Sequence, residues 1–173
     1  MQYEELLMRL SRLDEDASLM FDEDKRFRMV IVGGSGLILL ETITRATMDI
    51  DALGVSKELA GLLERYDINC RVGTFINNFP YNSEDRLHKV KLKGKKIDFY
   101  TASLDDIVIS KLFSNRDTDR RDITDPAVLR ALDWAKLEEI VSDEEEIKNN
   151  ALNERNYLDF LVNYSEYKRR FCP

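Results

Sequence analysis

The stretch that decides the fold reads RMVIVGGSGLILLETITRATMDIDAL and runs from Arg28 to Leu53. It opens on a short apolar, β-branched run that is typical of a buried strand, and Gly33 and Gly34 turn the chain at its end. The next segment, Leu37–Ile43, is apolar nearly all round, as in a helix buried behind a sheet. Thr47–Leu53 then alternates polar and apolar side chains, which predicts a second strand with one polar face.

Two carboxylates, Asp49 and Asp51, lie two positions apart on this second predicted strand. Side chains at such a spacing project from the same face, so the two acids repel each other unless a cation lies between them. Carboxylate oxygens suit Mg²⁺, which takes one or two protein carboxylates together with substrate phosphates. The pair therefore predicts a metal site, although an Asp-x-Asp is also common on a solvated strand face.

The glycine turn complements the acid pair. A strand that ends in Gly33-Gly34-Ser35 before a helix presents backbone N–H groups and a hydroxyl to a phosphate. Asp98 lies in the later strand-like run KIDFY and faces away from its apolar neighbours, so it reaches the pair if the strands are adjacent. Three acids can hold two metal ions about 3.5–4 Å apart, an arrangement for phosphoryl or nucleotidyl transfer.

The rest of the first hundred residues adds helices and short strands. Leucines at helical spacing predict a first helix over Tyr3–Phe21, and Ser56 is placed to cap another. Gly94 separates two strand-like runs and so predicts a hairpin. The remaining expected elements are strands over Ile68–Phe75, Leu87–Lys93 and Lys96–Tyr100, and a turn-rich loop over Asn77–Glu84.

From Ser103 onward the sequence predicts only helices. Ser103 and Asp106 form a capping box, and Asp125-Pro126 is a cap followed by proline at the first helical position. Two more helices are expected over Lys136–Lys148 and Leu152–Phe171. We predict an α/β (α+β) fold, with a small mixed sheet flanked by helices in residues 1–102. Residues 103–173 form a helical segment that completes the site and packs on this core.

Composition narrows the classes of function. The 173 residues carry a formal net charge of −7, which argues against an extensive nucleic-acid footprint. The two cysteines match no metal-ligand spacing and no disulfide framework. The N-terminus is not a signal peptide, and no apolar run approaches the roughly 18 residues of a membrane span. These features predict a cytoplasmic protein without a membrane partner.

Two basic features need separate interpretation. The segment HKVKLKGKK, residues 88–96, is either a solvated strand face that protects a sheet edge or a surface for an RNA acceptor or a triphosphate. Lys111 lies within the apolar stripe of its predicted helix, where it must snorkel, pair with an acid or face an anion-holding cavity. His88, the one histidine, is expected to pack rather than to act as a base.

At these residues the chain resembles the polymerase-β-like nucleotidyltransferase superfamily, most closely small bacterial members of the AbiEii toxin type. The segment GGSGLILLETITRATMDID, residues 33–51, is similar to their opening signature, including Arg45 and Thr47. The segment SKLFSNRDTDRRDITD, residues 110–125, is similar to their downstream Lys–Arg–Asp motif. The resemblance covers roughly residues 30–125, so the last helices carry no recognised motif.

The resemblance implies a role for each matching residue. Asp49 and Asp51 would bind Mg²⁺ or Mn²⁺, and Asp98 would be the third catalytic acid. Lys111 would reach a phosphate. The other residues implied to contact or support the nucleotide are Gly33, Gly34, Ser35, Arg45, Thr47, Asp122 and Asp125.

The expected reaction moves a nucleoside monophosphate from an NTP to a hydroxyl on RNA, protein or a small molecule. A toxin of this type would have an antitoxin partner. Two alternatives remain open from the sequence: a catalytically inactive nucleotidyltransferase-like binding module, and a partner-binding helical protein in which the last helices matter.

Overall fold

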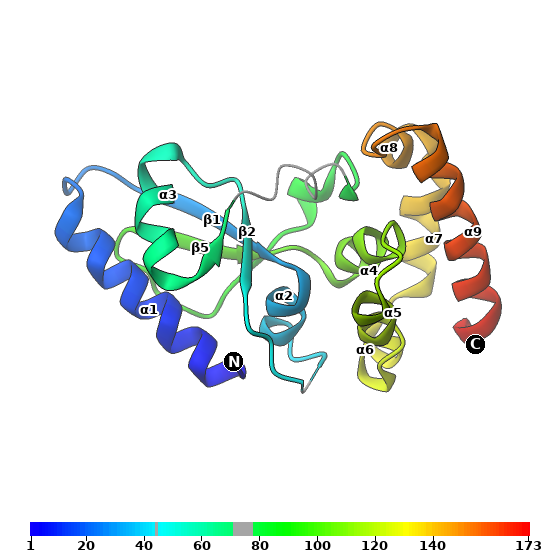
Figure 1. Ribbon diagram of the computed structural model, residues 1–173, viewed down its shortest axis with the longest axis horizontal. Coiled ribbons are helices and arrows are strands. Elements are labelled where there is room, and N and C mark those ends of the chain that lie inside the picture. Colours follow the sequence, from blue (N-terminus) through cyan, green and yellow to red (C-terminus); the bar gives the residue numbers. More distant parts are fainter. Residues whose placement is uncertain (44, 71–77) are drawn as a thin grey trace. The chain divides into compact units, whose positions relative to one another are not determined.

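The computed structural model describes residues 1–43, 45–70 and 78–173 (Figure 1). Contacts divide these residues into an α/β unit, residues 1–43, 45–70 and 87–102, and a helical unit, residues 78–86 and 103–173. The mixed α/β class predicted from the sequence is confirmed. Residues 78–86 group with the helices, whereas the sequence analysis placed them with the sheet. In the described part of the chain, no helix is both long and apolar enough to cross a membrane.

The described residues of the α/β unit form one mixed sheet of five strands in the order β3-β2-β1-β5-β4. The central strand β1 (Phe27–Val32) pairs antiparallel with β2 (Ile50–Leu53) and parallel with β5 (Ile97–Thr101). At the edges, β3 (Ile68–Asn69) runs parallel to β2, and β4 (His88–Lys89) runs antiparallel to β5. The part of the predicted strand Ile68–Phe75 that begins at residue 71 lies outside the described residues.

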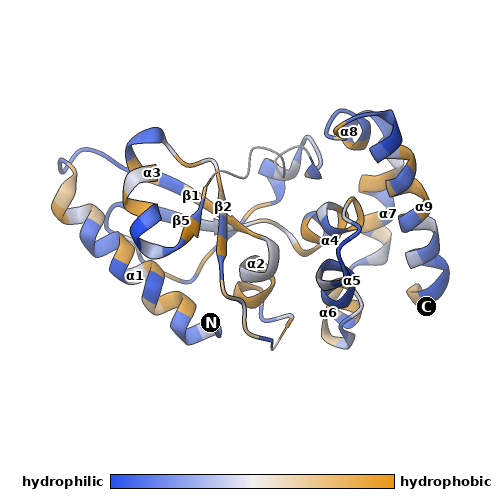
Figure 2. Cartoon of the chain, viewed as in Figure 1, coloured by the Kyte–Doolittle hydropathy of each residue, from blue (hydrophilic) through white to orange (hydrophobic). Residues whose placement is uncertain are grey.

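One face of the sheet is apolar because alternate residues of every strand point to the same side. Helices α1 (Tyr3–Met20) and α3 (Lys57–Leu63) lie together over the sheet, and their leucines supply its cover (Figures 1 and 2). The opposite face carries the charged residues of β1, β2 and β5. The buried side chains of the covered face are Phe27, Met29, Ile31, Ile50, Ala52, Ile68, Ile97 and Phe99.

Helix α2 (Gly33–Leu39) begins at the glycine turn itself, four residues before the predicted start at Leu37. The chain turns into the helix directly after β1, because Gly33 adopts a φ of 63° that a residue with a side chain rarely takes. The predicted cap of α3 is confirmed, since the Ser56 hydroxyl accepts a hydrogen bond from the Leu59 N–H at 3.3 Å. A short 3-10 turn, η1 (Glu64–Tyr66), ends this helix.

A buried carboxylate fastens α1 to the loop before β5. Asp14 is 4% exposed, and its oxygens accept the N–H groups of Lys95 at 2.6 Å, Lys96 at 2.8 Å and Ile97 at 2.7 Å. Gly94 permits this tight loop, because a Cβ at that position would lie 1.9 Å from the Ile97 carbonyl oxygen.

The antiparallel pairing expected on either side of Gly94 is present, but the first strand is much shorter than predicted. Strand β4 comprises His88 and Lys89, and one further backbone hydrogen bond joins the Val90 N–H to the Phe99 carbonyl of β5 at 2.9 Å. The chain then makes two consecutive i→i+2 turns, in which the Leu92 N–H donates to the Val90 carbonyl at 2.7 Å and the Gly94 N–H donates to the Leu92 carbonyl at 3.1 Å. Residues 90–96 are therefore a loop rather than the end of a strand.

The helical unit contains six described α-helices after a short 3-10 turn, η3 (Ser83–Arg86). The predicted caps are confirmed, because Ser103 accepts the Asp106 N–H at 3.1 Å and Asp125 accepts the Ala127 N–H at 2.8 Å. The single helix predicted over Lys136–Lys148 is wrong, since the Asp143 carboxylate caps a new helix through the Glu146 N–H at 3.1 Å. The helices are α4 (Leu104–Leu112), α5 (Asp117–Ile123), α6 (Pro126–Ala131), α7 (Trp134–Ser142), α8 (Glu144–Lys148) and α9 (Glu154–Phe171).

A buried ion network explains why residues 78–86 belong with the helices. The Arg86 guanidinium donates to Asp106 at 2.8 Å and to Glu146 at 2.7 Å, and both carboxylates are buried. Ser103 also donates to Asp106, at 2.6 Å. A paired guanidinium tolerates burial far better than an isolated one, so this arginine holds η3 against α4 and α8.

We expect Asp14→Ala to lower the free energy of unfolding by about 3–5 kcal/mol, because three backbone N–H groups lose their acceptor, two of them buried. Urea denaturation measures this change. The matched control is Glu15→Ala on the exposed side of α1, which should change the value by less than about 0.5 kcal/mol. Equal effects of the two substitutions would contradict the anchoring role of Asp14.

Candidate functional site

The glycine turn at the end of β1 lies directly against a carboxylate. The β1–β2 register pairs Asp51 with Val32, and a Cβ at Gly33 would lie 3.1 Å from the Asp51 Oδ2 atom. The missing side chain at Gly33 therefore lets the carboxylate approach the backbone of the turn. Asn69 of β3 donates its side-chain N–H to the other oxygen of Asp51 at 3.1 Å, which orients the carboxylate.

The segment before β2 folds over the second glycine of the turn. A Cβ at Gly34 would lie 3.1 Å from an Arg45 guanidinium nitrogen and 3.4 Å from the Thr47 hydroxyl. The Thr47 hydroxyl donates to the Asp49 carbonyl at 3.2 Å, and Asp49 itself is exposed immediately before the strand. The structure thus gathers the glycine turn, the Arg45 guanidinium and the Asp51 carboxylate at the C-terminal end of β1, with Asp49 two residues before Asp51 in the chain.

Ser35 belongs to the same turn but is buried at 1% exposure. Its hydroxyl donates to the Val32 carbonyl at 3.0 Å and so closes the turn from within. The sequence analysis expected this hydroxyl to reach a phosphate. In the structure the side chain instead fixes the backbone that the glycines shape.

Asp98 does not join the other two carboxylates. It lies on the same polar face of the sheet, but the parallel register pairs it with Arg28, whereas Asp51 is paired with Val32. Four residues of strand separate these positions, or about 13 Å. The position of β5 level with Asp51 is Ala102, which follows the Ile31–Thr101 pair. The expected convergence of three carboxylates, and with it the two-metal arrangement, is therefore not found.

Asp98 has other partners. The Arg26 guanidinium lies 3.0 Å from its Oδ1 atom and the Lys89 ammonium lies 3.5 Å from it. The hydrogen bond from Arg26 holds the pKa of Asp98 below its ordinary value.

Without Asp98, the site has two candidate metal ligands, Asp49 and Asp51. Within the described ranges, no group of three or more His, Cys, Asp or Glu side chains is placed to hold an ion. Two carboxylates nevertheless suit Mg²⁺, because this ion commonly completes its coordination with water and substrate phosphates. The site at Asp49 and Asp51 therefore fits a metal that arrives with a phosphorylated substrate.

Comparison with known protein families gives one match, which covers residues 8–172, to a family described as a nucleotidyltransferase of unknown function (DUF6036). The chain belongs to this nucleotidyltransferase family. A search of curated proteins and a search of solved structures gave no match. The predicted membership of a nucleotidyltransferase family is thus confirmed, while the particular likeness to the AbiEii type stays a prediction.

In the helical unit, Lys111 is buried between two acids. Its ammonium lies 2.5 Å from Asp119 and 2.8 Å from Asp122, and all three side chains are at most 7% exposed. Arg116 also reaches Asp119, at 2.6 Å. Of the alternatives open for Lys111, the structure shows pairing with acids.

The electrostatics around Asp119 favour its ionised state. Burial raises the pKa of Asp119, but the hydrogen bond from Lys111, supported by Arg116, outweighs that effect, so the pKa lies below its ordinary value. The resemblance also implied a supporting role for Asp125. This residue lies outside the cluster of Lys111, Asp119 and Asp122, and its carboxylate caps α6.

Sequence reasoning missed three partners of the candidate residues: Asn69, Asp119 and Arg26. Asp119 and Asp122 are three residues apart on one helix, which places both on the side that meets Lys111. That spacing was visible in the sequence. The pairings of Asn69 and Arg26 depend on strand register, which the sequence does not specify.

We expect Gly33→Ala and Gly61→Ala to have opposite effects on stability. Alanine at position 33 must adopt a positive φ and approach Asp51, which should cost about 1–2 kcal/mol. Gly61 lies inside α3 with open space around it, so alanine there should stabilise by about 0.5–1 kcal/mol. Thermal or urea unfolding measures both changes, and a stabilising Gly33→Ala would contradict the described turn.

We expect Lys111→Met to destabilise the protein by about 3–5 kcal/mol at pH 7, because two buried carboxylates lose the buried ammonium that lies between them. Without the ammonium, the cost of burying the charged carboxylate outweighs the remaining contact with Arg116, so the pKa of Asp119 should rise above its unfolded value. The folded variant then binds more protons than the unfolded chain, so its stability should rise as pH falls from 7 toward about 5.

The wild-type protein should show no such gain from Asp119 over the same range, because the lowered pKa of Asp119 keeps that acid ionised there. Burial raises the pKa of Asp105 in both proteins, so that contribution cancels in the comparison. Urea unfolding at several pH values makes the comparison. A Lys111→Met variant as stable as the wild type would indicate that the lysine is not needed between the acids.

Proposed function

We propose that the protein transfers a nucleoside monophosphate from an NTP to a hydroxyl group, with Mg²⁺ or Mn²⁺ as cofactor, in the cytoplasm. The observation that carries the proposal is the position of Asp51 against the Gly33 turn, in a chain of a nucleotidyltransferase family. Asp49, two residues before it and exposed, supplies the second carboxylate.

The residues around the glycine turn would bind the triphosphate and the divalent ion. The backbone of Gly33 and Gly34 and the guanidinium of Arg45 would bind the triphosphate, since planar guanidinium groups suit phosphate oxygens. Asp49 and Asp51 would hold the divalent ion, which when bound would neutralise charge on the departing pyrophosphate. Asn69 would keep the Asp51 carboxylate in place, through its hydrogen bond of 3.1 Å.

The residues of the helical unit would support the reaction indirectly. The Lys111 ammonium is occupied by Asp119 and Asp122, so we propose that it maintains the packing of α4 against α5. Asp125 would hold the start of α6 through its cap. In this proposal the phosphate-binding charge comes from Arg45 rather than from Lys111.

One observation favours a second candidate, a module that binds nucleotides without transferring them. Asp98 is about four strand residues from the acid pair, so the site has two carboxylates where a two-metal mechanism needs a third. Such a module would bind an NTP and release it unchanged. Binding of the NTP without label transfer, over a broad set of acceptors, would decide for it.

The acceptor would be a hydroxyl group on RNA, protein or a small molecule. We further propose that the protein acts in the cell as a toxin that is neutralised by an antitoxin partner. Growth arrest on induced expression, abolished by the double substitution Asp49→Asn/Asp51→Asn, would support the toxin role.

We expect the purified protein to transfer label from one of four α-³²P-labelled NTPs to a component of total RNA or cell lysate, in a reaction that requires a divalent metal. Asp49→Asn/Asp51→Asn should lower the labelling rate at least about a hundredfold, because both metal ligands are lost. Electrophoresis with and without nuclease or protease identifies the labelled class.

The matched control replaces two exposed aspartates elsewhere, Asp24→Asn/Asp67→Asn, with the same change of charge. Equal labelling by the wild-type protein and the Asp49/Asp51 variant would remove the catalytic proposal. The Mg²⁺ dependence of labelling tests separately whether Asp98 is a metal ligand. Asp51→Asn should raise the Mg²⁺ concentration for half-maximal labelling, and Asp98→Asn should leave it unchanged.

A further inference from the structure

A basic groove lies on the α/β unit, at the far end of the sheet from the glycine turn. Its volume is about 530 Å³, and the loop after β4 and the residue before β1 form its walls. Four of its lining residues are cations and one is a carboxylate, in a chain whose net charge is −7. The lining residues that the structure describes are Arg26, Lys89, Val90, Lys91, Leu92, Lys93, Gly94 and Asp98.

The loop displays its lysines on one side. Lys91 and Lys93 each stand at the centre of an i→i+2 turn and are exposed, while Val90 is buried and Leu92 is half-buried. This alternation directs the apolar side chains inward and the ammonium groups outward. Within the described ranges, neither Lys91 nor Lys93 has an ion pair with an acid, so both charges face solvent.

The single carboxylate of the groove is already neutralised. Asp98 is held by Arg26 at 3.0 Å and by Lys89 at 3.5 Å, so these three groups together still carry one positive charge. The lysines at positions 91 and 93 add two more. A groove with this excess of positive charge attracts a ligand with several negative charges at regular spacing.

The polar face of the sheet continues from this groove toward the acid pair. Arg28, paired with Asp98 in the register, lies with its guanidinium 5.2 Å from the ring centroid of Tyr100. Planar guanidinium and aromatic groups are surfaces on which unpaired bases stack. Asp51 lies on this same face about four strand residues, or roughly 13 Å, further on.

We propose that this groove binds the phosphate backbone of a single-stranded nucleic acid. The charges at Lys89, Lys91 and Lys93 would contact successive phosphates, and the Arg28–Tyr100 pair would stack a base. This binding does not depend on the proposed nucleotidyl transfer. Its use as the acceptor site, with the end of the strand extending toward Asp51, rests on the proposed nucleotidyl transfer.

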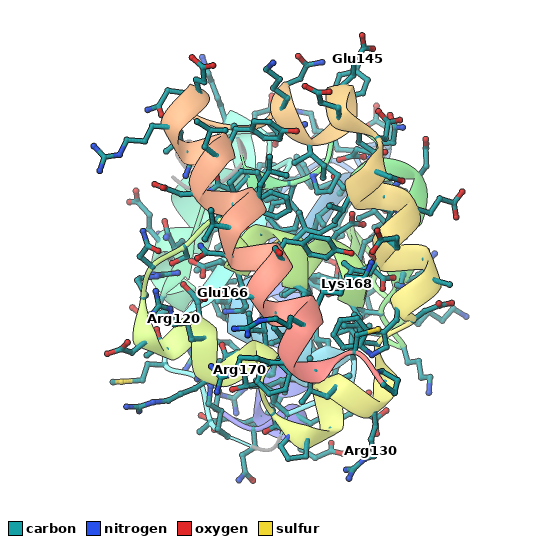
Figure 3. All side chains as sticks on the ribbon, turned by 90° about the vertical axis from the view of Figure 1, so that its right-hand side faces the viewer. Arg120, Arg130, Glu145, Glu166, Lys168 and Arg170 are labelled. Atoms are coloured by element: carbon teal, nitrogen blue, oxygen red, sulfur yellow. The ribbon has the colours of Figure 1, made fainter. Side chains whose placement is uncertain are left out.

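The helical unit offers a less suitable surface. Its hollow of about 180 Å³ is lined by Arg120 and Arg170, but Glu166 lies with them and offsets part of the charge (Figure 3). The buried Lys111 at its inner side is paired with two acids. The groove beside β4 therefore has the greater excess of accessible positive charge.

The test measures fluorescence anisotropy of short labelled single-stranded RNA and DNA with the full chain, without NTP or divalent metal, over a range of salt. Lys91→Glu/Lys93→Glu should weaken binding at least about tenfold near 0.1 M salt and reduce the slope of log K against log salt by about 1.4, the share of two phosphate contacts. Asp98→Asn should tighten binding about threefold, because it removes a competing carboxylate.

The matched control, Lys57→Glu/Lys148→Glu, makes the same change of net charge at exposed positions outside the groove. It should change affinity less than about twofold at this salt, where distant charges are screened. An unchanged salt slope in the Lys91/Lys93 variant, or an equal loss in the control, would overturn the proposal.

Two competitors complete the test. Tighter binding of an acidic peptide or of anionic lipid vesicles than of either oligonucleotide would assign the groove to another partner and overturn the proposal. Displacement of the oligonucleotide by ATP alone at low concentration would assign it to a triphosphate. Because the measurement needs no transfer, groove binding without any labelling would refute the proposed enzyme activity and leave this inference intact.

Discussion

The direction of the two strands beside β1 is the constraint on which the site depends. Antiparallel pairing brings Asp51 to the C-terminal end of β1, where the chain turns through Gly33. Parallel pairing leaves Asp98 at the other end of the same strand. A single sheet face thus holds Asp51 beside the glycine turn at one end and a basic groove at the other, and no side-chain rotation can bring Asp51 and Asp98 together.

Local sequence signals predicted the features that depend on neighbouring residues. The caps at Ser56, Ser103 and Asp125 follow from short side chains that reach N–H groups two or three residues ahead, and all are present. The glycine turn also lies where the sequence indicated, and Asp51 lies on the predicted strand, but this strand begins at Ile50 rather than at Thr47, so Asp49 lies just before it. Register was not predictable, because the hydrophobic alternation of β5 fixes the face of Asp98 but not its level along β1.

In the sequence, the buried charged residues could be recognised only because they interrupt the apolar stripes of their predicted helices. Lys111 interrupts an apolar helix stripe, and Asp14 does the same in α1, but neither sequence position names its partner. The structure supplies two carboxylates for the first and three backbone N–H groups for the second. In both cases the charge holds together segments that hydrophobic contacts alone would leave free to slide.

The Asp14 anchor also bears on the order in which the chain assembles. Its three hydrogen bonds join residues that are 81 to 83 positions apart. During synthesis, α1 leaves the ribosome about 4–16 s before those partners, at roughly 5–20 residues per second. Over that interval the backbone N–H groups that bind Asp14 have not yet been synthesised, so Asp14 can hold the helix in place only after β5 emerges. Helix α1 is therefore made well before the backbone groups that Asp14 binds are available to fix it.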